Sequence, residues 1–229
     1  MKYMKAVVLV LVGGLVLAFP LASFAADAQP STGAPVYKPP KRGAPGGRVG
    51  GGTRGIQREV FVLSVLAPDH SGFTTSEQPS LYWFISAATS LPVELTVMDP
   101  QGVQPILETR ITVPVQAGVH RVRLSDHNIR LSPGAPYRWF VAVVPDADRR
   151  SKDILAGGAI ERVDLSEELK LKVAKAKKFE LPSLYAEAGL WYDAVAAISE
   201  LIEAAPKDQG LRKERASLLT QVGLAGISE

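Results

Sequence analysis

The stretch Tyr137-Arg-Trp-Phe-Val-Ala-Val-Val144 decides the fold class of this chain. Every second residue from Tyr137 to Val143 is large and apolar, and the residues between them are also apolar after Arg138. A period of two indicates a β-strand, and apolar residues on both faces indicate a strand that is covered on each side. We therefore expect a sheet with two buried faces at the centre of the fold.

Similar runs rich in Val, Ile, Tyr, Trp and Phe lie on both sides of this stretch, separated by turns such as Asp99-Pro-Gln-Gly102. They predict a mainly β domain over residues 59–163, an antiparallel β-sandwich of immunoglobulin-like architecture, with Trp83 and Trp139 in the core between the sheets. A small open barrel is the alternative. The seven predicted strands are Val60–Leu66, Leu81–Ala87, Val93–Met98, Ile106–Val113, Val119–Leu124, Tyr137–Val144 and Ala159–Val163.

The remaining residues, 164–229, have helical periodicity and form a predicted helical C-terminal segment, a small hairpin or bundle. Asp164 is the expected N-cap of a first helix over Leu165–Lys178. Pro182 suits the first turn of a second helix, which ends at Gly189. A third helix is predicted over Tyr192–Ala204, and a last one stops near Gly223.

The N-terminal residues predict export. Residues 1–25 combine two lysines, an apolar run and a small-residue end, as in a secretory signal peptide, which places the mature protein in the periplasm or outside the cell. An uncleaved membrane anchor is the alternative. Residues 26–58 are rich in Pro, Gly and basic side chains and form a predicted linker that cannot fold alone. No membrane span is expected after cleavage.

Composition excludes several classes of function. The 229 residues contain no cysteine, so disulfides, thiolate metal sites and cysteine nucleophiles are impossible. Without the two signal-peptide lysines, 24 basic residues stand against 23 acidic ones, which gives no electrostatic case for a nucleic-acid partner. The basic excess lies in residues 26–58, where six Lys and Arg face a single Asp.

Part of the helical segment resembles one tetratricopeptide repeat. Tyr185, Gly189, Ala194 and Pro206 match spaced positions of that repeat. A peptide-binding superhelix needs several stacked copies, and no second full copy is present. We therefore expect a helical hairpin that packs on the β domain.

A wider resemblance rests on several motifs in a fixed order. Taken together, they resemble the bacterial family catalogued as domain of unknown function 928, over about Tyr37 to Gly223. The resemblance implies an exported protein with no established activity or catalytic residue. The motifs are Tyr37-Lys-Pro-Pro-Lys-Arg-Gly-Ala-Pro-Gly-Gly-Arg-Val-Gly-Gly-Gly-Thr-Arg-Gly55, Leu66-Ala-Pro68, Pro79-Ser-Leu-Tyr-Trp-Phe84, Leu131-Ser-Pro-Gly134, Tyr137-Arg-Trp139 and Ala159-Ile-Glu-Arg162.

Five residues are candidates for binding. Arg48, Thr53 and Arg54 could bind anions or fix the glycine-rich arm to the sandwich, and Trp191 and Tyr192 could bind a partner or contact the sandwich. Gly50-Gly-Gly-Thr-Arg-Gly55 has the spacing of a dinucleotide fingerprint, but it precedes a predicted strand instead of a helix. No cofactor is therefore expected.

The sequence shows no catalytic or metal-ligand constellation. His70, His120 and His127 are the three histidines, and none lies in a metal-ligand spacing. We therefore predict a non-enzymatic binding or adaptor module whose partner is another envelope protein. A module that binds polysaccharide or peptidoglycan through the basic arm and surface aromatics is the alternative, and an unrecognised hydrolase is the third hypothesis. The aromatics are Tyr82, Trp83, Phe84, Tyr137, Trp139 and Phe140.

Overall fold

A computed structural model describes residues 33–40, 48–50 and 61–227. The predicted signal peptide lies outside the described residues. Of the predicted linker, only residues 33–40 and 48–50 are described.

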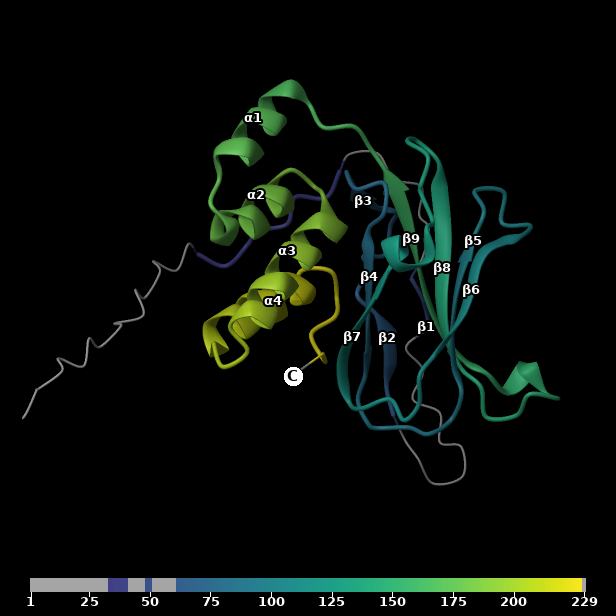
Figure 1. Cartoon of the computed structure of the whole chain (residues 1–229). Coiled ribbons are helices and arrows are strands. Elements are labelled where there is room, and N and C mark those ends of the chain that lie inside the picture. The colour runs from purple at the N-terminus through teal and green to yellow at the C-terminus, as the bar shows by residue number, and fades with distance from the viewer. Residues whose placement is uncertain (1–32, 41–47, 51–60, 228–229) are drawn as a thin grey trace, which may run out of the picture. The chain divides into compact units, whose positions relative to one another are not determined.

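Two β-sheets and a set of C-terminal helices make up the described chain, which confirms the predicted fold class (Figure 1). One sheet has the order β1-β9-β8-β5-β6, with β3 parallel to β9, and the other has the order β2-β4-β7. The strands are β1 (Val49–Gly50), β2 (Leu63–Val65), β3 (Gly72–Thr74), β4 (Ser80–Ile85), β5 (Val93–Met98), β6 (Pro105–Ile111), β7 (Gly118–Arg123), β8 (Pro136–Val143) and β9 (Ile154–Arg162).

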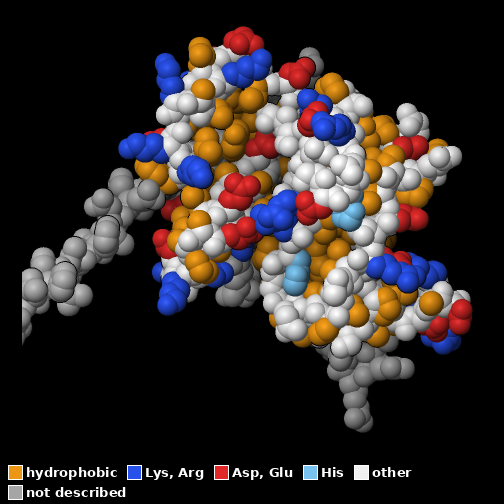
Figure 2. All heavy atoms as spheres, viewed as in Figure 1, with side chains coloured by type: hydrophobic (Ala, Val, Ile, Leu, Met, Phe, Trp, Pro, Cys, Tyr) orange, Lys and Arg blue, Asp and Glu red, His pale blue; other side chains and the backbone are white. Residues whose placement is uncertain are grey.

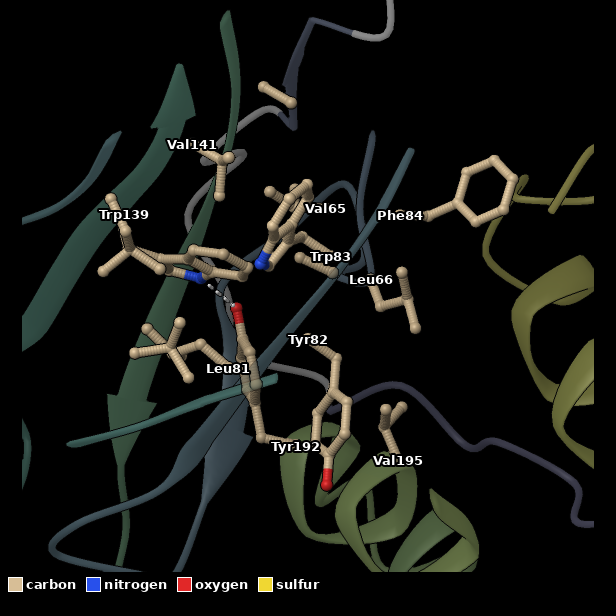
Figure 3. Close-up of a cluster of buried hydrophobic side chains, with 14 of the residues drawn as sticks. Val65, Leu66, Leu81, Tyr82, Trp83, Phe84, Trp139, Val141, Tyr192 and Val195 are labelled. Atoms are coloured by element: carbon tan, nitrogen blue, oxygen red, sulfur yellow. Dashed lines mark hydrogen bonds between the residues drawn. The ribbon is translucent and has the colours of Figure 1, made fainter. Parts of the chain in front are cut away.

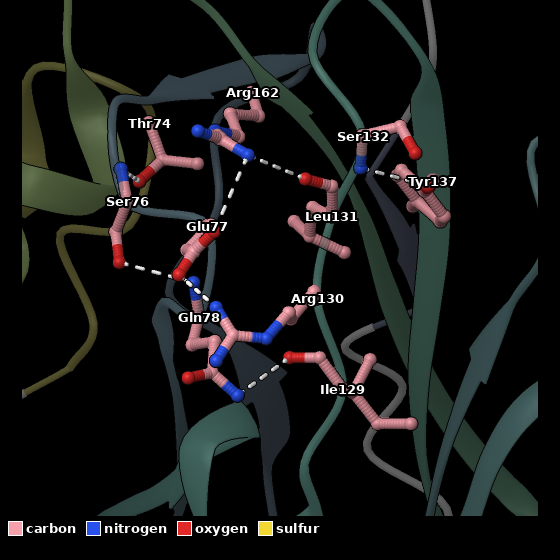
Figure 4. A network of polar contacts seen from close by, with 10 residues as sticks. All are labelled: Thr74, Ser76, Glu77, Gln78, Ile129, Arg130, Leu131, Ser132, Tyr137 and Arg162. Atoms are coloured by element: carbon pink, nitrogen blue, oxygen red, sulfur yellow. Dashed lines mark hydrogen bonds and ion pairs between the residues drawn. The ribbon is translucent and has the colours of Figure 1, made fainter.

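The strand order is that of an immunoglobulin-like sandwich, in which β2-β4-β7 and β9-β8-β5-β6 correspond to strands A-B-E and G-F-C-C′. The Tyr137 hydroxyl, at the start of β8, accepts a hydrogen bond of 3.1 Å from the backbone N–H of Ser132, as in the tyrosine corner of that fold (Figure 4). Antibody domains have a bridging cysteine two residues after this tyrosine. This chain has Trp139 there, and Trp139 and Trp83 are both fully buried, as predicted.

Polar contacts hold the loop before β4 against the loop before β8 (Figure 4). Glu77 pairs with Arg130 and lies 3.8 Å from Arg162. Arg162 also donates a hydrogen bond of 3.0 Å to the Leu131 carbonyl, and Gln78 donates one of 3.3 Å to the Ile129 carbonyl. These contacts fix the end of the sandwich at which the helices begin.

Three strand features differ from the sequence prediction, and one is β1, which lies inside the predicted linker and pairs with β9. β9 begins at Ile154, five residues before its predicted start, because its Gly157-Gly158 pair hides the alternation. A side chain at Gly157 would meet the Phe140 ring at 2.4 Å, so glycine allows that ring to pack on the backbone. β3 was not predicted as a strand, and its parallel pairing with the distant β9 makes it one.

The helices follow the predicted order and fill one side of the fold. They are α1 (Glu167–Lys175), α2 (Leu181–Glu187), α3 (Trp191–Ala204) and α4 (Gln209–Thr220), with short 3-10 turns η1 (Leu124–His127), η2 (Arg150–Lys152) and η3 (Lys178–Glu180). The expected N-cap Asp164 is wrong: Ser166 caps α1, because its hydroxyl accepts the Leu169 N–H at 3.3 Å. Pro182 lies in the first turn of α2, as predicted.

The hydrophobic core continues from the sandwich into α3 (Figure 3). The Tyr192 side chain enters the sandwich, where its hydroxyl accepts a hydrogen bond of 2.8 Å from Trp139 Nε1 and donates one of 3.0 Å to the Ala159 carbonyl. A side chain at Gly72 would meet the Tyr192 ring at 2.6 Å, so β3 needs glycine at this position. Helix and sheets therefore share one core.

Candidate functional site

The structure places Trp191 and Tyr192 in the contact between α3 and the sandwich. Trp191 is fully buried and donates a hydrogen bond of 2.8 Å to the Leu66 carbonyl, and Tyr192 is 2% exposed. Both side chains therefore contact the sandwich, which is one of the two roles that we considered for them from the sequence. A direct contact with a partner would require that these two side chains leave the core.

Arg48, directly before β1, bridges the sandwich and the turn that follows α4. Its guanidinium donates hydrogen bonds of 3.2 Å to the Ala67 carbonyl and 3.0 Å to the Val222 carbonyl, and lies 3.3 Å from an Asp69 carboxylate oxygen. The side chain is 15% exposed, and these three contacts occupy its guanidinium. The other two arm candidates, Thr53 and Arg54, lie outside the described residues.

A second part of the predicted linker, residues 33–40, is packed on the helices. Tyr37 is buried with its ring edge-on to Trp191 at 4.9 Å between centroids, and its hydroxyl lies 2.9 Å from His70 Nε2. The backbone on either side pairs with Gln221 and with the Ala186 carbonyl. Composition alone did not indicate this contact, because the residues that bury Tyr37 are more than 30 positions away.

The aromatic residues of β4 and β8 do not form an exposed stacking surface. Trp83, Tyr137 and Trp139 are at most 5% exposed, as are Tyr82 and Phe84 on the opposite face of β4 (Figure 3). Only Phe140 is half-buried. Aromatic stacking on a sugar requires an exposed ring, so these side chains give the polysaccharide hypothesis little support.

The three histidines lie in separate environments. His70 contacts Tyr37, and burial lowers its pKa. His120 stacks on Trp83 at 4.6 Å between centroids and bonds the Gln116 carbonyl at 2.7 Å, while His127 lies in η1. Among residues 33–40, 48–50 and 61–227, no three His, Asp or Glu side chains are arranged to hold a metal ion.

The strongest candidate site is a hollow between β7 and the helices α3 and α4, with a volume of about 600 Å³. We call it the arginine groove. Strand β7 provides one wall, α3 and α4 provide the other, and Tyr82 contributes from β4. Its lining residues are Tyr82, Ala117, Gly118, Val119, His120, Arg121, Arg123, Ser199, Ile202, Glu203, Pro206, Arg212 and Arg215.

The groove is rich in basic side chains. Its lining contains four arginines and a single acidic residue, Glu203. Arg121 and Glu203 lie 3.0 Å apart across the groove, which joins β7 to α3. Arg123 is 47% exposed and lies 3.9 Å from Asp126. In the space-filling view, basic and acidic side chains meet along the boundary between the helices and the sheets, with two histidines nearby (Figure 2).

Two arginines of α4 hold the helical wall of the groove in place. Arg215 on α4 is 5% exposed and donates a hydrogen bond of 2.8 Å to the Ser199 hydroxyl on α3. Arg212 donates one of 2.7 Å to the Pro206 carbonyl at the turn between these helices. The wall is therefore fixed by contacts among its own side chains.

The basic residues of β7 lie on one face of the strand because its side chains alternate between the two faces. Val119, Arg121 and Arg123 lie opposite Phe84, Tyr82 and Ser80 of β4 and so share the face that is turned to the helices. The strand was predicted from its sequence, and its period of two indicates that Arg121 and Arg123 share a face. No local sequence pattern indicates that this face meets α3 and α4.

Two smaller hollows have fewer features of a binding site. One of about 300 Å³ lies between α2–α3 and the loop before β4, and includes Asp193 and Glu200. The other, of about 280 Å³, lies on β5 and β6, where Glu94 pairs with Arg110 and Arg150. Neither has an excess of basic side chains, because the first lining contains no Lys or Arg and the second contains two arginines and two glutamates.

Fold and groove together define the chain as an immunoglobulin-like β-sandwich with a helical segment and a basic groove between them. The family model described as Domain of Unknown Function (DUF928) matches residues 49–229, and the chain belongs to that family. We expected the resemblance to extend from about Tyr37 to Gly223. The family match starts later, at Val49, and ends later, at Glu229. A comparison with curated proteins gives no match. Within the described residues, no helix is both long enough and apolar enough to cross a membrane.

Proposed function

We propose that this protein is a non-enzymatic binding module, exported to the periplasm or beyond, whose arginine groove binds an acidic segment of another envelope protein. One observation carries the proposal: Arg121 and Arg123 of β7 line a groove of about 600 Å³ whose lining contains two further arginines and a single acidic residue. Preorganised guanidinium groups bind carboxylates well because their donors match the carboxylate geometry.

The other described features favour a protein partner over a saccharide. The β4 and β8 aromatics that a sugar would stack on are almost all buried. His70 bonds to the Tyr37 hydroxyl and His120 to the Gln116 carbonyl, so neither imidazole is paired with a described serine or threonine as a catalytic base would be. The groove is lined by strand and helix residues, which hold side chains more precisely than loops do.

The test is a crosslinking pull-down from envelope extract with the mature chain and two variants of equal charge. The groove variant is Arg121→Gln/Arg123→Gln, and the control is Arg110→Gln/Arg138→Gln, which removes two exposed arginines on the other sheet. We expect one protein to be captured by the mature chain and the control and lost with the groove variant. Its crosslinked peptide should be acidic.

Two outcomes would contradict the proposal. Equal capture by both variants would place the contact outside the groove. Capture of an anionic polysaccharide in place of a protein, with the same dependence on Arg121 and Arg123, would identify the groove as a glycan site.

A further inference from the structure

Strand β7 forms one wall of the arginine groove and is also an edge strand. The three-stranded sheet has the order β2-β4-β7, and among the described residues β7 pairs only with β4. An edge strand has backbone N–H and C=O groups on one side that no neighbouring strand uses.

The hydrogen-bond pattern shows which residues present these groups. The Leu124 N–H donates to the Pro79 carbonyl at 3.0 Å, so Leu124 belongs to a hydrogen-bonded pair. In an antiparallel ladder such pairs alternate with pairs whose backbone groups point away from each other. The regular register between β4 and β7 therefore turns the backbone groups of Val119, Arg121 and Arg123 outward.

The pairing of β4 with β2 independently shows which residues of β7 direct their backbone groups outward. Leu66 donates its N–H to the Tyr82 carbonyl at 2.8 Å, so the backbone groups of Tyr82 point to β2 and those of its neighbours, Leu81 and Trp83, point to β7. Leu81 and Trp83 lie opposite Val122 and His120. These two residues of β7 therefore use their backbone groups inside the sheet, which leaves those of Val119, Arg121 and Arg123 at the free edge.

The residues with outward backbone groups are the same three that turn their side chains into the groove. A strand added here would bond to their backbone, and each of its residues opposite Val119, Arg121 or Arg123 would point into the groove as well. The intervening residues would lie on the face of His120 and Val122, beside the sandwich core. The site thus selects acidic side chains on one face of the new strand and apolar ones on the other.

From this geometry we infer that the acidic partner binds as an extended strand that adds to the free edge of β7. The inference rests on the proposed function and names its binding mode. A second copy of this chain does not fit, because pairing of two β7 edges would bring Arg121 and Arg123 of both copies together. The linker, residues 26–58, does not fit either, because it is basic. The occupant is therefore an acidic segment of another protein with alternating acidic and apolar residues.

The probe is a ten-residue peptide of alternating Glu and Val, capped at both ends, titrated by fluorescence anisotropy against the mature chain. A peptide with five Glu followed by five Val has the same charge and composition without the alternation. Two further alternating peptides have N-methyl groups on three central residues, either on the Glu amides or on the Val amides.

An antiparallel added strand directs the Glu amides to β7, because a residue opposite Arg121 shares its face and its hydrogen-bonding phase. We expect the Glu-methylated peptide to bind about tenfold or more weakly, since it loses several hydrogen bonds to the β7 backbone. The Val-methylated peptide should bind as the parent does, and the block peptide more weakly.

The failures are distinguishable. If all four peptides bind equally and lose affinity in the Arg121→Gln/Arg123→Gln variant, the groove binds acidic chains but no strand is added. If none binds, the proposed function itself is wrong. Loss of binding with the Val-methylated peptide alone would show a parallel added strand and overturn the antiparallel geometry.

Discussion

Tyr192 is the residue that joins the helical segment to the sandwich. Its hydroxyl bridges Trp139 Nε1 and the Ala159 carbonyl inside the core. Tyr192→Phe would leave a buried donor and a buried acceptor without this partner. We expect the free energy of unfolding to fall by about 1–3 kcal/mol. Urea denaturation measures the change, with Tyr185→Phe as a control, because the Tyr185 hydroxyl makes no hydrogen bond with a described residue. Equal effects of both variants would contradict this role.

Asp193, the next residue of α3, predicts a dependence of stability on pH. Its carboxylate accepts hydrogen bonds from the Thr74 hydroxyl at 2.7 Å and from the Thr75 N–H and hydroxyl at 2.7 and 3.0 Å. Burial raises its pKa above the ordinary value of 3.8, and the three hydrogen bonds offset this only in part. The folded state therefore holds the Asp193 proton more tightly than the unfolded state does.

The sign of this effect follows from proton linkage. The contribution of Asp193 is complete below pH 3.8 and is lost as the pH rises through the higher pKa of the folded state. The stability of the parent protein relative to Asp193→Asn should therefore fall as the pH increases from 3.8. Urea denaturation of both proteins over a pH series measures this. A difference that grows with pH would mean that the hydrogen bonds outweigh burial.

At the scale of elements, the segment 33–40 contributes to the core although its sequence is that of a linker. Tyr37→Ala would remove a ring that packs on Trp191, at a cost of about 3 kcal/mol by analogy with other buried aromatic residues. Val36→Ala is the matched control, since Val36 is 56% exposed. We expect a lower urea midpoint and a red shift of tryptophan emission for Tyr37→Ala alone. Unchanged stability would show that the segment does not contribute to the fold.

The strands and helices also show what the sequence could and could not predict. Alternation in Tyr137–Val143 correctly indicated a strand, and one of its faces is buried throughout, but on the other face Arg138 is exposed and Phe140 is half-buried. β3 and the first half of β9 were missed, since glycine has no side chain to show a pattern and their pairing is remote in sequence. For the candidate site, the sequence of β7 does indicate that Arg121 and Arg123 share one face of the strand. Their position beside α4 depends on residues about 90 positions away, and no local pattern contains that information.

At the scale of the whole molecule, the sandwich depends on the helices. The face of β4 that contains Tyr82 and Phe84 is buried, and Leu66 and Trp139 bond to Trp191 and Tyr192. A chain that ends at Arg162 would expose these groups. We expect this truncated chain to lack the near-ultraviolet circular dichroism of the mature protein and to bind a hydrophobic dye. A native-like spectrum from the truncated chain would show that the sandwich folds without the helices.

The arginine groove lies where these two parts of the molecule meet, so its function requires both of them. The most direct test is a titration of the alternating Glu-Val peptide against the mature chain, the Arg121→Gln/Arg123→Gln variant and the Arg110→Gln/Arg138→Gln control at low and high salt. We predict saturable binding to the mature chain and the control, at least about tenfold weaker binding to the groove variant, and weaker binding at high salt. Equal affinity for all three proteins would contradict a binding role for the groove.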